Sequence, residues 1–202
     1  SLGEGRHWQI RRRRLWIRRE EERWLYATDL LGSQGVETVV STARKAQELP
    51  WVTIVGGTDE VPSITPSLPD KPILLKAKDP VQILPRATLR MVIPVPVWIT
   101  LSAGVVVLDG ETDPCSRTWF GDAQAGEPAY ALPIADWMLG VEPVQGAESV
   151  HVPIKVTNDS QSLLSFQRLL VRVVHLSVFR EEGMLFTNDV SVTFKSVSQY
   201  SH

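Results

Sequence analysis

The placement of proline is the feature that most restricts what this sequence can fold into. All fourteen prolines lie between residues 50 and 153. Proline lacks the backbone N–H that helix interiors and β-ladders require, so this density favours short strands, sheet edges and turns. At most two short helices are expected. One spans residues 42–49 and the other residues 133–139, where a proline suits the first turn and Gly140 follows the end.

Strand patterns recur along the chain, at residues 87–93, 95–100, 150–156, 169–179, 184–187 and 190–194. Residues 150–156 and 190–194 alternate apolar with polar side chains, which is typical of half-buried strands. Residues 169–179 are mostly apolar on both faces and predict a central strand. The turn Glu181-Glu182-Gly183 then predicts a hairpin to the next strand. The two stretches around Pro94 and Pro96 predict two strands or one bent strand.

The N-terminal segment leaves two interpretations open. Residues 13–28 could form a charged helix or a hairpin with residues 20–22 at its tip. We favour the hairpin because Trp16, Trp24 and Tyr26 have strong strand preferences. Tryptophans spaced by eight residues, beginning at Trp8, also fit neighbouring strands of a meander.

These patterns together predict a mostly β protein, an antiparallel β-sandwich with an N-terminal hairpin or meander layer. A chain of 202 residues can form one large domain or two small ones. The loop-like stretch 63–72 favours an N-terminal layer over residues 1–77 and a main sandwich over residues 78–202. One continuous domain is the alternative.

The charge is small overall but uneven along the chain. The net charge is −2, and residues 1–23 hold eight arginines against four glutamates. The run Arg11, Arg12, Arg13 and Arg14 is a candidate contact for phosphate or an anionic membrane surface. Because glutamates follow at once, we favour a solvated, salt-bridged face and do not expect nucleic-acid binding.

Motifs for common chemistry are absent from the sequence. It contains no GxxxxGK[ST], GxGxxG, GxSxG, HExxH or CxxC pattern. We therefore expect no enzyme activity, no metal and no cofactor. No apolar run approaches the roughly 18 residues that span a bilayer. The single Cys115 suits a reducing compartment, and no signal-peptide pattern occurs, so we expect a cytoplasmic location.

Residues 112–130, TDPCSRTWFGDAQAGEPAY, form the most distinctive stretch. Its candidate interaction residues are Arg117, Trp119, Phe120, Tyr130, Asp113 and Glu127. In a structural interpretation, Trp119 and Tyr130 hold a long connection on the sandwich. In a functional one, the stretch is a recognition loop, because Arg, Trp and Tyr are enriched at binding hot spots.

Four stretches also resemble a known family. They are SLPDKPILLKAKDPVQILP (67–85), MVIPVPVWITL (91–101), the stretch 112–130 and LFTNDVSVTF (185–194). They resemble an uncharacterised prokaryotic family, the domain of unknown function numbered 432 (DUF432), over most of the chain. The resemblance implies no activity. It implies an association with a membrane channel protein only by analogy with members found beside mechanosensitive channels.

The leading functional hypothesis is a non-enzymatic β-sandwich module that binds another protein or self-associates. A second hypothesis is a binder of a small carbohydrate or anion, or an enzyme, that uses Arg117, Asp113 and Glu127. A third is contact with a membrane surface or nucleic acid through the arginines of residues 11–14.

Overall fold

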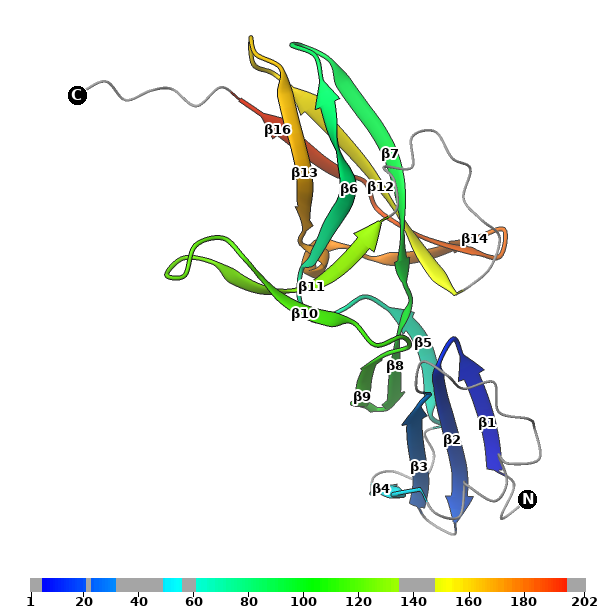
Figure 1. Ribbon diagram of the computed structural model, residues 1–202. Coiled ribbons are helices and arrows are strands. Elements are labelled where there is room, and N and C mark those ends of the chain that lie inside the picture. Colours follow the sequence, from blue (N-terminus) through cyan, green and yellow to red (C-terminus); the bar gives the residue numbers. More distant parts are fainter. Residues whose placement is uncertain (1–4, 21–22, 32–48, 56–60, 135–147, 196–202) are drawn as a thin grey trace. The chain divides into compact units, whose positions relative to one another are not determined.

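The computed structural model describes residues 5–20, 23–31, 49–55, 61–134 and 148–195. These residues form an almost entirely β protein, which confirms the predicted fold class (Figure 1). The chain divides into two compact units. One comprises Ser1–Ser67 and Trp98–Pro114, and the other comprises Leu68–Val97 and Cys115–His202. The units are discontinuous in sequence, and the expected boundary near residue 77 falls inside a strand of the second unit.

The first unit is a sandwich of two sheets. One sheet has the order β1-β2-β3-β4 and the other has the order β5-β8-β9. Their strands are β1 (Gly5–Ile10), β2 (Arg13–Glu20), β3 (Arg23–Leu30), β4 (Val52–Ile54), β5 (Ser63–Ser67), β8 (Trp98–Ala103) and β9 (Val105–Glu111). Leu15 and Ile17 of β2 pack with Ile99 and Leu101 of β8 in the core between the sheets.

The N-terminal hairpin prediction is confirmed. Strands β2 and β3 pair antiparallel, and β1 pairs with the other side of β2. Trp8, Trp16 and Trp24 accordingly lie on three neighbouring strands of a meander. Arg11 begins the β1–β2 turn with φ of 52°, a conformation that tight hairpins require.

The second unit is a larger sandwich. One sheet has the order β10-β11-β6-β13, and in the other β12 pairs with β7, β15 and β16, with β14 beside β15. Their strands are β6 (Ile73–Ile83), β7 (Thr88–Pro96), β10 (Ser116–Phe120), β11 (Glu127–Ile134), β12 (Ser149–Asn158), β13 (Leu164–Val171), β14 (Val178–Glu181), β15 (Met184–Thr187) and β16 (Val190–Phe194). Leu75, Ile93 and Val152 are among the core residues between these sheets.

The second unit departs from a purely antiparallel sandwich because both of its sheets are mixed. Strand β11 pairs parallel with β6, and β12 pairs parallel with β15 and β16. On one side of β12, the first part of the strand pairs with β15 and the part from Ile154 onward pairs with β16. Pro153 lies between the two and has no register partner in either strand. Proline cannot donate to a ladder, so it suits this gap between the two partners.

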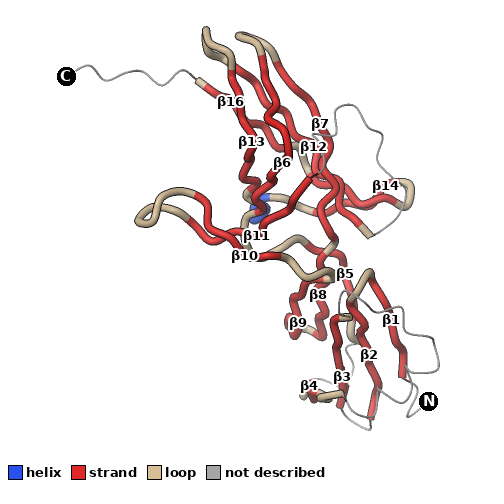
Figure 2. The backbone as a smooth tube through the Cα atoms, viewed as in Figure 1, coloured by secondary structure: helices blue, strands red, loops and turns tan. Residues whose placement is uncertain are grey.

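The prediction of a central strand over residues 169–179 is wrong. Strand β13 ends at Val171, a short 3-10 helix spans Val173–His175, and β14 begins at Val178 (Figure 2). Val174 is 76% exposed, so this apolar run does not lie between two layers. The hairpin that follows is confirmed, since Glu182 and Gly183 have φ values of 47° and 82°.

The helix predictions fall mostly outside the described residues. Residues 42–48 and 135–139 are not described, and Pro133 and Ile134 belong to β11 instead of beginning a helix. The sequence around Pro94 and Pro96 forms two strands, but β7 extends through both prolines and the break falls at Val97, before β8 begins at Trp98.

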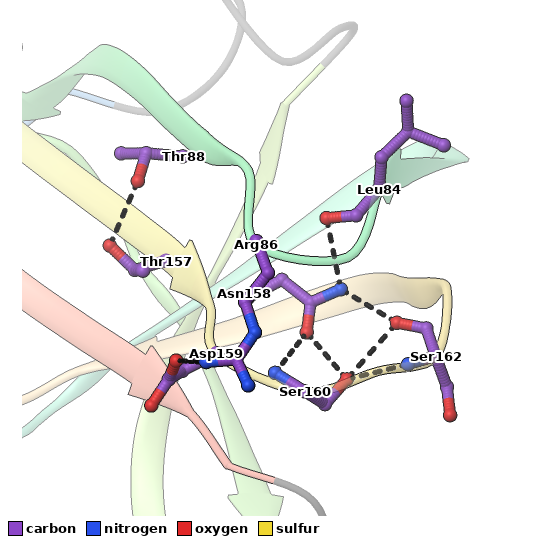
Figure 3. Close-up of polar contacts among 8 residues, drawn as sticks. All are labelled: Leu84, Arg86, Thr88, Thr157, Asn158, Asp159, Ser160 and Ser162. Atoms are coloured by element: carbon purple, nitrogen blue, oxygen red, sulfur yellow. Dashed lines mark hydrogen bonds and ion pairs between the residues drawn. The ribbon is translucent and has the colours of Figure 1, made fainter.

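A buried polar cluster joins the β6–β7 turn to the β12–β13 turn (Figure 3). The fully buried Asn158 side chain donates to the carbonyl oxygens of Ile83 (2.9 Å), Leu84 (3.2 Å) and Ser162 (2.8 Å). Its Oδ1 accepts from the backbone N–H (3.1 Å) and the hydroxyl (2.7 Å) of Ser160. Every polar atom of this buried amide is therefore paired, as burial demands.

Candidate functional site

The distinctive stretch 112–130 is shared between the two units. Thr112 and Asp113 belong to the first unit, and Cys115 begins the part that belongs to the second. Thr112 is fully buried, and its carbonyl accepts a hydrogen bond from the Arg12 N–H (3.0 Å). Asp113 forms an ion pair with Arg11. This end of the stretch therefore holds the β1–β2 turn in place.

The remainder of the stretch forms the β10–β11 hairpin, whose loop is held by Asp122. The Asp122 carboxylate accepts from the backbone N–H groups of Gln124 (2.8 Å) and Ala125 (2.7 Å). These bonds hold the pKa of Asp122 below its usual value, with the bond from Ala125 the largest cause. The Asp122 carbonyl also accepts from the Gly126 N–H at 2.9 Å. The loop is thus ordered by its own hydrogen bonds.

Trp119 lies on this loop in a defined position. Its Nε1–H donates to the Asp122 carbonyl oxygen at 2.9 Å. A Cβ atom at Gly126 would lie 2.1 Å from Trp119 Nε1, so the indole rests directly on the glycine backbone. The side chain nevertheless remains 51% exposed. A large aromatic group is therefore fixed by its loop while about half of its surface stays in contact with solvent.

Tyr130, in contrast, is a buried structural residue. It is 6% exposed, and its hydroxyl donates to Asp70 at 2.9 Å. Burial raises the pKa of Tyr130, and the bond to Asp70 adds to that effect. Partial burial acts to raise the pKa of Asp70, but the hydrogen bonds from Lys71 and Tyr130 outweigh it and hold that pKa low. The structural interpretation of the stretch thus fits Tyr130.

Arg117 and Phe120 occupy opposite faces of β10. Arg117 pairs in register with Tyr130, and Phe120 pairs with Glu127. Strand alternation therefore places Arg117 on the same face as Trp119, and Phe120 on the other. Arg117 is exposed, and its guanidinium forms no ion pair within the described part of the chain. Arg117 and Trp119 thus form an exposed pair on one face of the edge strand.

The acidic residues of the second hypothesis are not brought together. Asp113 pairs with Arg11 in the first unit, while Glu127 pairs with Arg172 at 2.5 Å in the second. Neither carboxylate shares a contact with Arg117. The combination that a carbohydrate or anion pocket would need is therefore absent from the described contacts.

The four consecutive arginines are used inside the first unit. Arg11 pairs with Asp113, and Arg12 donates to the carbonyl of Leu31. Arg13 donates to the carbonyl of Glu111 and to the Thr28 hydroxyl, and Arg14 pairs with Asp29 at 2.5 Å. Burial lowers the pKa of Arg13 despite the nearby acids. A phosphate group would have to displace these partners to reach the arginines.

A model of the protein family of unknown function DUF432 matches residues 1–202, the whole length of the sequence. The chain belongs to the DUF432 family. No curated protein and no solved structure matches this DUF432 chain. The resemblance carried by the four sequence stretches is thereby confirmed, and the family brings no assigned activity with it.

Other chemistry-bearing residues of the DUF432 chain stand apart. Among the described residues, no three or more His, Cys, Asp or Glu side chains gather closely enough to hold a metal ion. His151 is 3% exposed, and its Nδ1 lies 3.2 Å from the Leu185 carbonyl oxygen. Over the same residues, no helix has the length and apolar character needed to cross a membrane.

A groove on the second unit was not predicted from the sequence. The groove has a volume of about 270 Å³ and is lined by Arg90, Met91, Val92, Pro153, Ile154, Lys155 and Asp189. Arg90 and Lys155 are direct cross-strand neighbours of β7 and β12. Only strand pairing reveals this proximity, because no local motif links the two segments.

Proposed function

We propose that this DUF432 protein is a non-catalytic β-sandwich module that binds another protein chain through its β10–β11 hairpin. The observation that carries the proposal is the state of Trp119, which is held by the Asp122 carbonyl and by contact with Gly126 while remaining 51% exposed. Ordinary surface side chains are not fixed in this way. A partner would meet an aromatic surface that is already in position.

Pre-ordering has a direct energetic consequence for binding. Association normally loses about 0.5–1.5 kcal/mol for each flexible side chain that becomes immobile. Trp119 has already lost most of that freedom in the free protein. Trp and Arg are also the residue types most enriched at binding hot spots. The neighbouring Arg117, which has no ion pair in the described structure, supplies a charged group to the same face.

The chemistry of the rest of the chain supports a binding role over catalysis. Asp113 and Glu127 of the stretch are paired with arginines, and the arginine run is engaged within the first unit. The half-buried lone thiol of Cys115 suits a protein that works in a reducing compartment such as the cytoplasm.

Affinity capture from a lysate of the source organism tests the proposal with three variants. Trp119→Ala removes the indole. Gly126→Ala keeps the indole but displaces it together with the loop, because the new Cβ would clash with Trp119 Nε1 (2.1 Å) and with the carbonyl oxygens of Asp122 (2.5 Å) and Phe120 (2.7 Å). Phe179→Ala is the matched control, since Phe179 is a similarly exposed aromatic (54%) on the distant edge strand β14. Circular dichroism must show that all variants remain folded.

We expect the wild type and Phe179→Ala to retain the same protein. Trp119→Ala and Gly126→Ala should each retain it at least about 10-fold less, the range for a hot-spot residue. Equal retention by all four folded proteins would refute the proposed binding hairpin.

A further inference from the structure

At the outer edge of β10, the backbone presents hydrogen-bonding groups that no other described strand uses. The Tyr130 N–H donates to the Pro72 carbonyl (2.8 Å), so the polar groups of Tyr130 face β6 and not β10. Arg117, its register partner, must then direct its own N–H and C=O away from β11. The N–H and C=O of Trp119, two residues along β10, also point away from β11. Its partner Pro128 has no N–H to donate.

Two other edges in this unit, β7 and β13, are interrupted. In β7, Val97 donates to the Glu148 carbonyl, so alternation directs Pro94 and Pro96 outward and removes two edge donors. Strand β13 carries a register shift between Phe166 and Arg168. Strand β10 has neither device, and within the described chain β11 is its sole strand partner.

We propose that the partner of this edge is β10 of a second copy of the chain, paired antiparallel about a two-fold axis at Thr118. This inference rests on the proposed function and names its partner. Arg117 of each copy lies opposite Trp119 of the other copy. The outward N–H and C=O groups of these residues then form four hydrogen bonds across the axis, because both positions of each pair are outward-facing.

The side chains select this register over its neighbours. It places each Arg117 guanidinium beside an exposed indole, where a cation–π contact forms twice by symmetry. A shift that sets Arg117 against Arg117 brings two cations together, which destabilises a sheet pair. A shift the other way sets Arg117 against Gly121, which has no side chain and a φ of 104°. The register at Thr118 alone uses both exposed side chains.

The resulting assembly closes on itself. Four strands from each copy join into one continuous sheet through the two β10 edges. An isologous contact of this kind consumes both edges, so it ends at a dimer instead of growing into a fibre. The contact is small, and we expect an association that depends on protein concentration.

A disulfide test reads the register directly. Facing residues at a non-hydrogen-bonded antiparallel position have Cα atoms about 4.5 Å apart, within the range that a disulfide spans. Thr118 would face itself at such a position. In the full chain with Cys115→Ser, we expect Thr118→Cys to form an intermolecular disulfide under mild oxidation. Ser116→Cys should not, because Ser116 would face Phe120 of the second copy.

Sedimentation of the full chain over a concentration series gives the second measurement. Arg117→Ala loses both cation–π contacts and should weaken the dimer about 10-fold. Arg117→Pro should abolish it, because proline removes an outward N–H that the hairpin itself does not use.

Three outcomes would overturn the dimer: a monomer at every concentration, equal crosslinking of both cysteine variants, or a dimer indifferent to Arg117→Pro. In each case, Trp119-dependent capture of a different protein would leave the proposed binding function standing. If that capture is also lost, both the dimer and the proposed binding function are refuted.

Discussion

Replacing Asn158 should destabilise the second unit more than any exposed substitution near it. The side chain is fully buried and makes five hydrogen bonds to two turns that are far apart in sequence. Asn158→Ala removes all five and leaves backbone carbonyls such as that of Ile83 without their donor. Because these groups are buried, water cannot replace the lost hydrogen bonds.

The magnitude follows from the number of bonds. Two N–H hydrogens and one carbonyl oxygen account for about four effective bonds, each worth roughly 1 kcal/mol net. We therefore expect Asn158→Ala to lower the free energy of unfolding by about 3–4 kcal/mol. Arg86→Ala is the matched control. It breaks an exposed ion pair with Asp159 at the same place, and such pairs contribute about 0–1 kcal/mol.

Asn158→Asp refines the test because it preserves shape. The new carboxyl would face three carbonyl oxygens, so its pKa in the folded protein should lie above that in the unfolded chain. The unfolded chain then binds fewer protons, and stability falls as pH rises. We expect this variant to be least stable at neutral pH and to recover partly in acid, unlike Asn158→Ala.

Urea denaturation followed by far-UV circular dichroism measures these differences, and amide exchange locates them. Exchange should quicken at the β6–β7 and β12–β13 turns of Asn158→Ala. If Asn158→Ala lowers the free energy of unfolding by less than about 1 kcal/mol, as we expect of Arg86→Ala, the hydrogen bonds of Asn158 do not stabilise the two turns in the way proposed.

Three further substitutions test separate parts of the account. Tyr130→Phe removes the hydroxyl bond to Asp70 and should cost about 1 kcal/mol in chemical denaturation. Tyr130→Phe should also raise the pKa of Asp70 toward its ordinary value. Because the pKa of Asp70 is depressed in the wild type, the stability that its ionised form contributes is present above about pH 4 and is lost as pH falls. An unchanged Asp70 pKa in a carboxyl NMR titration of the variant would contradict the importance of this contact. Arg14→Ala removes a guanidinium that is 4% exposed and paired with Asp29. We expect the free energy of unfolding to fall by about 2 kcal/mol, a moderate loss because Asp29 is partly solvated. A loss below about 0.5 kcal/mol would contradict a structural role for Arg14. Gly183→Ala meets no neighbouring atom but must adopt φ near 82°, so a loss of about 1 kcal/mol in the melting-derived free energy is expected, and no loss would show that the turn relaxes.

Local sequence pattern predicted the N-terminal hairpin and the clearly alternating strands but missed others, among them β6, β9 and β5, the last within the stretch expected to be loop-like. Residues 150–156 and 190–194 alternate strictly, and their valines and Ile154 pack in the core, whereas Phe194 is exposed. The prediction for residues 169–179 was wrong because a mostly apolar run gives no clear periodicity. Its interruption by a 3-10 helix around Val174 is set by tertiary structure.

The candidate site was only partly predictable for a related reason. Residue types drew attention to Trp119 and Tyr130, but the same types serve burial and binding. What separates them is a bond from Trp119 to the Asp122 carbonyl and one from Tyr130 to Asp70. The second partner lies far away in sequence, as do the partners of Arg11 and Arg13, so no local motif could supply them.

Residue-resolved amide exchange of Arg117 and Trp119 tests the binding edge most directly. Both N–H groups face away from β11, so they should exchange rapidly in the isolated chain. They should slow markedly once the partner, whether a captured protein or a second copy at high concentration, is bound. The outward amides of β7 at Arg90 and Val92 serve as the internal reference, since Pro94 and Pro96 carry no N–H. Protection of these two amides with β7 unchanged is the result we predict; bound partner with both amides still exchanging rapidly would contradict the account.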